Sequence, residues 1–150
     1  MPQSLSRVLI HLVFSTKNRA PSLLPSVQTE LHAYLAGVLK GVDCPTLQAG
    51  GVDDHVHLLF GLSRTRSTSE VVETVKTSSS KWIKTKGAPF VGFHWQAGYG
   101  AFSVSQSEAE TVVTYIKNQA RHHQKMTFQE EYRRFLERHQ VAYDERYVWD

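Results

Sequence analysis

Two histidines stand one residue apart in the apolar segment DDHVHLLF, residues 53–60. In an extended strand alternate side chains point to the same face, so His55 and His57 would converge while Val56 and Leu58 point the other way. Two protonated imidazoles side by side would repel each other, and two neutral ones in a core would waste apolar burial. A shared divalent ion removes both objections, because neutral imidazole is a common metal ligand. The alternative is that each is an ordinary buried histidine with a backbone partner.

A third ligand would have to come from elsewhere in the chain. Tyr115 and Gln119 in YIKNQ are four residues apart, which places them on one face of a helix. This spacing is not specific by itself, since a tyrosine at a helix edge commonly packs with its hydroxyl in water. His122 follows Gln119 by three residues and is a competing ligand. Asp54, beside His55, would either orient the imidazole or cap a hairpin, and both roles remain open.

The elements that must position these residues alternate in type. Hydrophobic periodicity and turn residues predict strands within residues 6–16, 45–51, 53–62 and 93–105, and helices within 23–42, 69–87, 108–125 and 128–139. Ser67, Ser107 and Thr127 each precede a glutamate by three residues, the pattern of a capping box at a helix start. The order predicts one α+β domain over residues 1–150, with a ferredoxin-like or RRM-like antiparallel sheet and helices packed mainly on one face.

Composition sets the class of protein. The chain has 150 residues, 17 Lys and Arg against 14 Asp and Glu, and eight histidines, a balance that slightly favours an acidic partner such as nucleic acid. The single cysteine, Cys44, excludes an internal disulfide and a cysteine zinc ribbon. No apolar stretch approaches the ~20 residues of a membrane span, and nothing near the N-terminus has the pattern of a signal peptide. These features predict a cytoplasmic protein with no membrane partner.

Several segments together resemble a known family. IHLVFSTKNR, DDHVHLLF, WQAGYGAFSVS and YIKNQ occur in the order and spacing of the single-tyrosine HUH transposases of small bacterial insertion sequences, and of their relatives associated with repetitive extragenic palindromes (REP). The resemblance implies that His55, His57 and Gln119 bind Mg²⁺ or Mn²⁺. It also implies that Tyr115 attacks single-stranded DNA and becomes joined to a 5′ phosphate.

The resemblance extends to partners. It implies recognition of a hairpin formed by an imperfect palindrome in single-stranded DNA. It also implies a homodimer in which the tyrosine helix of one subunit often completes the metal site of the other. The protein would be bacterial, and nucleoid-associated when bound to DNA.

The residue types suit this chemistry. A divalent ion can act as a Lewis acid and a template for a phosphodiester under attack. Tyrosine, with an ordinary pKa of ~10, needs activation near neutral pH but leaves more easily than an alkoxide, which favours reversible strand transfer. Tyr99, between two glycines, is the competing nucleophile among the six tyrosines.

DNA contacts require cations and exposed aromatic rings. The candidates are Lys17, Arg19, Lys81, Trp82, Lys84, Arg121 and His122. The alternative is a solvated helix face for the lysines and a core position for Trp82. Three functions remain open: an active DNA nuclease and strand transferase, a domesticated and non-mobile DNA-binding protein, and an RNA-binding module. The last is disfavoured, because neither strand carries the paired aromatic platform that such modules use.

Overall fold

Four antiparallel strands form the centre of the protein, in a computed structural model that describes residues 2–150. The sheet order is β2-β3-β1-β4, so β1 and β3 are the inner strands. The strands are β1 (Leu9–Ser15), β2 (Thr46–Gly51), β3 (His55–Gly61) and β4 (Gly100–Val104). This arrangement confirms the predicted α+β class and the antiparallel sheet.

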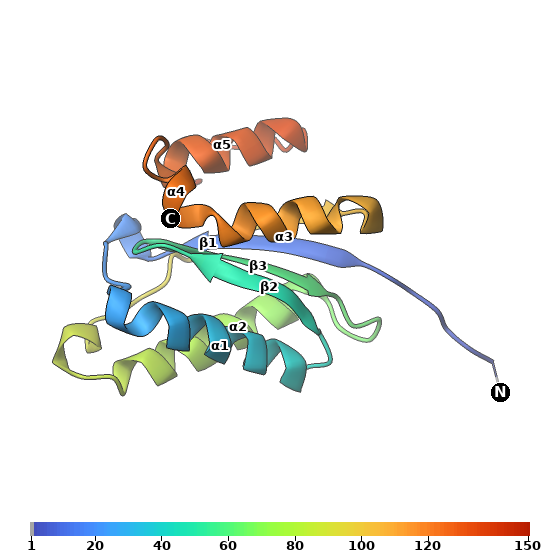
Figure 1. The fold of residues 1–150 in the computed structure, drawn as a ribbon, viewed down its shortest axis with the longest axis horizontal. Helices are drawn as coiled ribbons and strands as arrows, with labels where there is room; N and C mark the ends of the chain where they lie inside the picture. The colour runs from blue at the N-terminus through green and yellow to red at the C-terminus, as the bar shows by residue number, and fades with distance from the viewer. Residues whose placement is uncertain (1) are drawn as a thin grey trace.

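Helices cover both faces of the sheet (Figure 1). The two long helices, α1 (Pro25–Gly41) and α2 (Thr68–Lys84), pack against each other on one face. The shorter α3 (Ala109–Lys117), α4 (Gln119–His122) and α5 (Phe128–Arg138) lie on the other. The prediction of helices mainly on one face therefore describes the two long helices, and the C-terminal helices add a second layer. Together the two layers bury every residue of β1 and leave neither face of that strand to solvent.

The inner strands divide their side chains between two cores, as a period of two requires. Even-numbered residues join the core under α1 and α2; they are Ile10, Leu12, Phe14, Val56, Leu58 and Phe60. Odd-numbered residues face the C-terminal helices, where Val13 packs with α5 and Leu59 packs with α3. His55 and His57 therefore belong to the face covered by α3, α4 and α5.

Helix boundaries agree with the sequence in part. Ser67 and Thr127 accept hydrogen bonds from the backbone N–H groups three residues later, which confirms these two caps. The capping box predicted at Ser107 is wrong: a 3-10 turn, η3 (Gln106–Glu108), precedes α3, and the Ser107 hydroxyl bonds to that of Ser105. The helix predicted over 108–125 is interrupted at Asn118, whose φ of −98° and ψ of 20° separate α3 from α4. Only residues 100–104 of the segment 93–105 form a strand.

A close approach between α3 and β2 sets the position of the C-terminal layer. A Cβ atom on Gly50 would lie 2.8 Å from both the side chain and the carbonyl oxygen of Ile116. Glycine therefore lets α3 lie directly on the edge of the sheet, where Tyr115 and Gln119 come over β3. Within residues 2–150 no helix combines the length and the apolar character needed to cross a membrane.

Candidate metal and nucleophile site

The two histidines of β3 lie together as the strand pattern predicts. Both imidazoles are fully buried, and their ring centroids are 5.1 Å apart. β3 is paired on both sides, with β1 and with β2, so its backbone is held along its whole length. The shared face predicted for His55 and His57 is confirmed.

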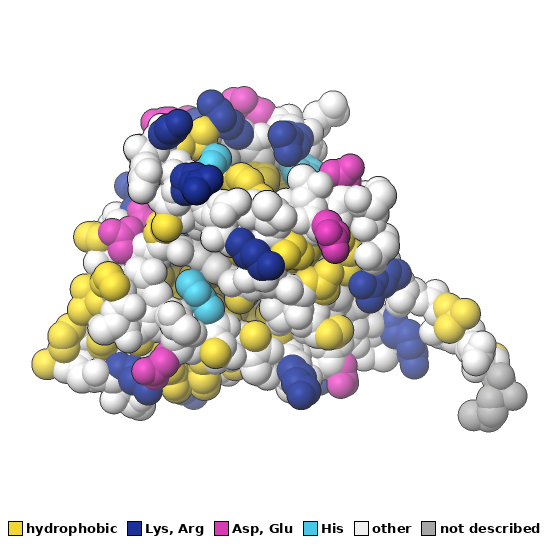
Figure 2. All heavy atoms as spheres, in the orientation of Figure 1, with side chains coloured by type: hydrophobic (Ala, Val, Ile, Leu, Met, Phe, Trp, Pro, Cys, Tyr) yellow, Lys and Arg dark blue, Asp and Glu magenta, His cyan; other side chains and the backbone are white. Residues whose placement is uncertain are grey.

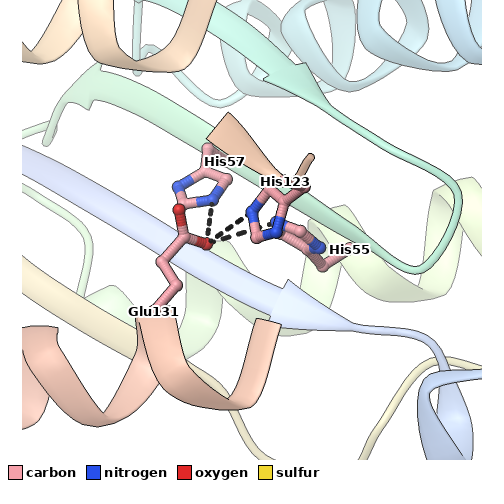
Figure 3. A group of neighbouring side chains, drawn as sticks. All are labelled: His55, His57, His123 and Glu131. Atoms are coloured by element: carbon pink, nitrogen blue, oxygen red, sulfur yellow. Dashed lines mark hydrogen bonds and ion pairs between the residues drawn. The ribbon is translucent and has the colours of Figure 1, made fainter. Parts of the chain in front are cut away.

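A carboxylate from α5 lies among the imidazoles (Figure 3). Oε1 of Glu131 is 3.0 Å from Nε2 of His57, 3.2 Å from Nε2 of His123 and 3.3 Å from Nε2 of His55. The four side chains offer ligand atoms that all lie within 4.8 Å of one another. Three imidazole nitrogens and one carboxylate oxygen form a donor set that suits a divalent transition metal. The group is consistent with a divalent metal site.

The second carboxylate oxygen connects this cluster to the predicted nucleophile. The Tyr115 hydroxyl donates a hydrogen bond to Oε2 of Glu131. The amide nitrogen of Gln119 donates to the same oxygen at 3.2 Å, and the amide oxygen of Gln119 is 3.1 Å from Nε2 of His55. Tyr115 and Gln119 therefore meet at one carboxylate, although the helix that was predicted to carry both is broken between them.

Further side chains hold the imidazoles in place. Oδ1 of Asp54 lies 2.6 Å from Nδ1 of His55, and Nε2 of His11 lies 2.8 Å from Nδ1 of His57. In each ring the other nitrogen, Nε2, is thereby turned toward Glu131, an arrangement typical of metal-ligating histidines. The backbone oxygen of Asp54 also accepts from the Thr16 N–H, which extends the β1–β3 pairing to the residue before His55.

The charges of the cluster follow from its burial and hydrogen bonds. For His55, burial opposes the charged form, but the hydrogen bonds to Asp54 and Glu131 outweigh it and raise the pKa to about 9. For His57, burial dominates and lowers the pKa to about 4. Burial disfavours the Glu131 carboxylate, yet its contacts with the histidines hold its pKa well below the ordinary value. Burial and the charge of Glu131 raise the pKa of Tyr115, so without metal or DNA the phenol stays protonated.

Sequence reasoning missed two members of the cluster. His123 lies within the helix predicted over 108–125 and is not among the predicted ligands, yet its Nε2 contacts both Gln119 and Glu131. Glu131 lies within the helix predicted over 128–139 and is not among the predicted site residues either. A signal was present, because Glu131 lies at helical spacing from Phe128 and Phe135, and a carboxylate on an apolar helix face requires a buried partner.

The competing candidates occupy different places. Nε2 of His122 is 3.1 Å from the Tyr115 hydroxyl and 3.5 Å from Oε2 of Glu131, so His122 adjoins the predicted nucleophile, while His123 contacts the other oxygen, Oε1. The Tyr99 ring instead lies beside α2, with Nζ of Lys76 at 5.8 Å from its centroid.

The candidate DNA contacts are divided between the two faces of the protein. Lys81, Trp82 and Lys84 lie on α2, on the far side of the sheet from the histidines. Trp82 is partly buried and stacks on Tyr34, with ring centroids 4.8 Å apart.

The other candidates lie on segments that adjoin cluster residues, since Thr16, just before Lys17, bonds to Asp54. Lys17 and Arg19 form the turn η1 (Lys17–Arg19) after β1, and Arg121 and His122 lie on α4 with Gln119. Figure 2 shows Lys and Arg side chains gathered over α4 and α5, at the top of that view.

Comparisons with solved structures support the fold. Two of these structures have a similar one. One is a protein from Deinococcus radiodurans R1 assigned as a transposase, with a TM-score of 0.62 and 23% identity over 79% of this chain and 98% of that one. The other is a REP-associated tyrosine transposase bound to a REP hairpin, with a TM-score of 0.61 and 14% identity over 82% of this chain and 73% of that one. At these identities the likeness establishes the fold alone.

Sequence comparison supplies the family. No curated protein sequence matches the chain. Residues 4–119 match the model of the family described as "Transposase IS200 like". This match spans more than half of the 150 residues and includes both β3 histidines, Tyr115 and Gln119. The chain therefore belongs to the IS200-like transposase family.

Proposed function

We propose that this protein is a metal-dependent single-stranded DNA endonuclease and strand transferase that forms a 5′-phosphotyrosine intermediate. The observation that carries the proposal is the meeting of the Tyr115 hydroxyl and the two β3 imidazoles at one carboxylate, Glu131. A nucleophile and a metal-binding donor set within one hydrogen-bonded cluster are what phosphodiester cleavage by tyrosine requires.

The metal would be Mg²⁺ or Mn²⁺, held by His55, His57 and Gln119. His123 and Glu131 add donors in the same place, and a set rich in imidazole favours Mn²⁺ over the oxygen-preferring Mg²⁺. When bound, the ion would supply Lewis-acid stabilisation of charge on the phosphate. Asp54 and His11 would hold the two β3 imidazoles with Nε2 facing the site.

The chain's own residues account for the proton of the nucleophile. The two oxygens of Glu131 have separate partners, since Oε1 faces the imidazoles and Oε2 faces Tyr115 and Gln119. Oε2 is therefore placed to take the phenolic proton as the Tyr115 oxygen forms its bond to phosphorus. The bond from phosphorus to the 3′ oxygen breaks in the same displacement, and that oxygen takes up a proton from water. In the reverse reaction the 3′ hydroxyl gives a proton to water and attacks the phosphotyrosine, the bond from phosphorus to the Tyr115 oxygen breaks, and that oxygen takes back a proton from Oε2 of Glu131.

The proposed substrate is single-stranded DNA that carries a hairpin. The name of the structural neighbour bound to a REP hairpin supports it, as do the cations over α4 and α5. We also propose a homodimer. In the single chain α3 packs on β2 and β3 of its own sheet, so action of Tyr115 in trans would require α3 to be exchanged between subunits.

Covalent capture tests the nucleophile. Wild-type protein, Tyr115→Phe and the control Tyr99→Phe would be incubated with hairpin-bearing single-stranded DNA and Mn²⁺, and denaturing gels would show any protein–DNA adduct. Wild type and Tyr99→Phe should form the adduct, and Tyr115→Phe should bind DNA without forming it, because only the hydroxyl is lost. An adduct that persists in Tyr115→Phe and disappears in Tyr99→Phe would refute the proposal.

A further inference from the structure

A cavity of about 270 Å³ lies between α3 and α5, next to the Tyr115 hydroxyl. Its wall on the side of the cluster includes Tyr115, Glu131 and His122. The rest of the lining is largely apolar, with Phe135 as its main ring. Two arginines of α5, Arg134 and Arg138, complete the lining. The cavity therefore combines an apolar wall, two cations and the proposed nucleophile.

The two arginines are one helical turn apart on the same face of α5, and both are exposed. Within residues 2–150 neither has a carboxylate within ion-pair distance, whereas Arg133 of the same helix pairs with Glu145 at 2.7 Å. Two guanidinium groups without carboxylate partners beside a nucleophile form a site for phosphate, which arginine binds in a bidentate manner.

The position of the cavity limits what can occupy it. The scissile phosphate must touch the Tyr115 hydroxyl. The two nucleotides that this phosphate joins must therefore lie beside the hydroxyl. On the other side of the hydroxyl, His55 and His57 are fully buried and Glu131 is 1% exposed, which leaves no room for a base there. The cavity offers that room, and an aromatic wall such as Phe135 suits a stacked base.

We propose that this cavity receives the unpaired nucleotide next to the scissile phosphate, with Arg134 and Arg138 holding its phosphate and Phe135 contacting its base. The inference rests on the proposed function, because it assigns a binding place to part of the same substrate. It predicts that the protein distinguishes a hairpin with an unpaired flank from the same hairpin without one, and that these two arginines carry the difference.

Binding without metal tests this separately from cleavage. Fluorescence anisotropy in EDTA would compare a hairpin that carries an unpaired flank of about six nucleotides, the bare hairpin, and the flank alone. In Arg134→Ala/Arg138→Ala the affinity for the flanked hairpin should fall by about tenfold or more, with little change for the bare hairpin. The slope of log affinity against log salt should decrease in magnitude by about 1.4, the value for two single-strand phosphate contacts.

Two further variants separate the effect of the cavity from the effect of charge. Arg64→Ala/Arg66→Ala removes the same charge from exposed residues outside the cavity and should leave the preference for the flank intact. Thr111→Phe puts a ring into the cavity from an exposed position of α3 and should abolish the preference without removing charge. Phenylalanine and threonine have similar helix propensities, so the helix should be retained.

The outcomes separate this inference from the proposed function. If the α5 arginine variant and Thr111→Phe bind the flanked hairpin as wild type does, the cavity assignment is wrong, even where wild type still forms the Tyr115 adduct. The same holds if the arginine variant weakens the bare hairpin equally, since that would indicate general attraction to DNA. If wild type forms no adduct but the arginines still carry flank binding, the cavity assignment stands and the proposed cleavage chemistry fails.

Discussion

Replacing Glu131 by glutamine would test the central feature of the site. The carboxylate is 1% exposed and contacts His55, His57 and His123 through one oxygen, and Tyr115 through the other. Removing one partner of a buried ion pair costs about 3–5 kcal/mol, because it leaves the other partner buried without compensation. Individual charge-assisted hydrogen bonds contribute about 1.5–3 kcal/mol, but they do not add here, since glutamine keeps one acceptor oxygen.

We therefore expect Glu131→Gln to lower the free energy of unfolding by about 3–5 kcal/mol at neutral pH. With a urea dependence of about 2 kcal/mol/M, the unfolding midpoint of the metal-free protein would fall by about 2 M. The matched control is Glu130→Gln, which changes the exposed neighbouring residue and should alter stability by less than about 0.5 kcal/mol. The pKa of His55, measured by NMR, should drop from about 9 because one of its two carboxylate partners is lost.

Equal urea midpoints for Glu131→Gln and Glu130→Gln, measured in EDTA, would refute this reasoning. So would a His55 pKa that stays near 9 in Glu131→Gln, because Asp54 alone would then account for the protonated imidazole. Either result would mean that the carboxylate of α5 does not hold the cluster together in solution.

Three other predictions concern the site and its supports. A metal ligand must be neutral imidazole, and the pKa of His55 is about 9. The affinity for Mn²⁺, measured by calorimetry, should therefore rise about tenfold per pH unit from pH 6.5 toward 9. A flat pH profile would contradict this. Gly50→Ala should destabilise the protein in urea melts, since its Cβ would lie 2.8 Å from Ile116 of α3. Gly37→Ala, in open space on α1, should instead stabilise the protein by about 0.5–1 kcal/mol. The reverse order of stabilities would refute the close approach. Ser67→Ala should cost about 1 kcal/mol through loss of a cap, and Ser107→Ala much less, so equal losses would contradict the observed helix starts.

Parts of the site depend only on local geometry and could be predicted from the amino-acid sequence. Alternation along a strand is enough to put His55 and His57 on one face, whatever the rest of the fold. The caps at Ser67 and Thr127 follow from hydrogen bonds that span three residues. The resemblance of four short segments to a known family gave Tyr115 and Gln119 their roles, which their four-residue spacing alone is not specific enough to assign.

Tertiary structure decided which residues complete the cluster. The contact between His57 and Glu131 spans 74 positions along the chain, and that between His55 and Gln119 spans 64. The helix break at Asn118 turns α4 away from the axis of α3, and the loop after α4 lets α5 return over the sheet. The second helical layer covers the odd-numbered face of the inner strands, where Leu9, Val13 and Leu59 are apolar and the buried histidines need partners. Local patterns specify which way a side chain points within its own element, but the partner it meets depends on the packing of elements distant in sequence.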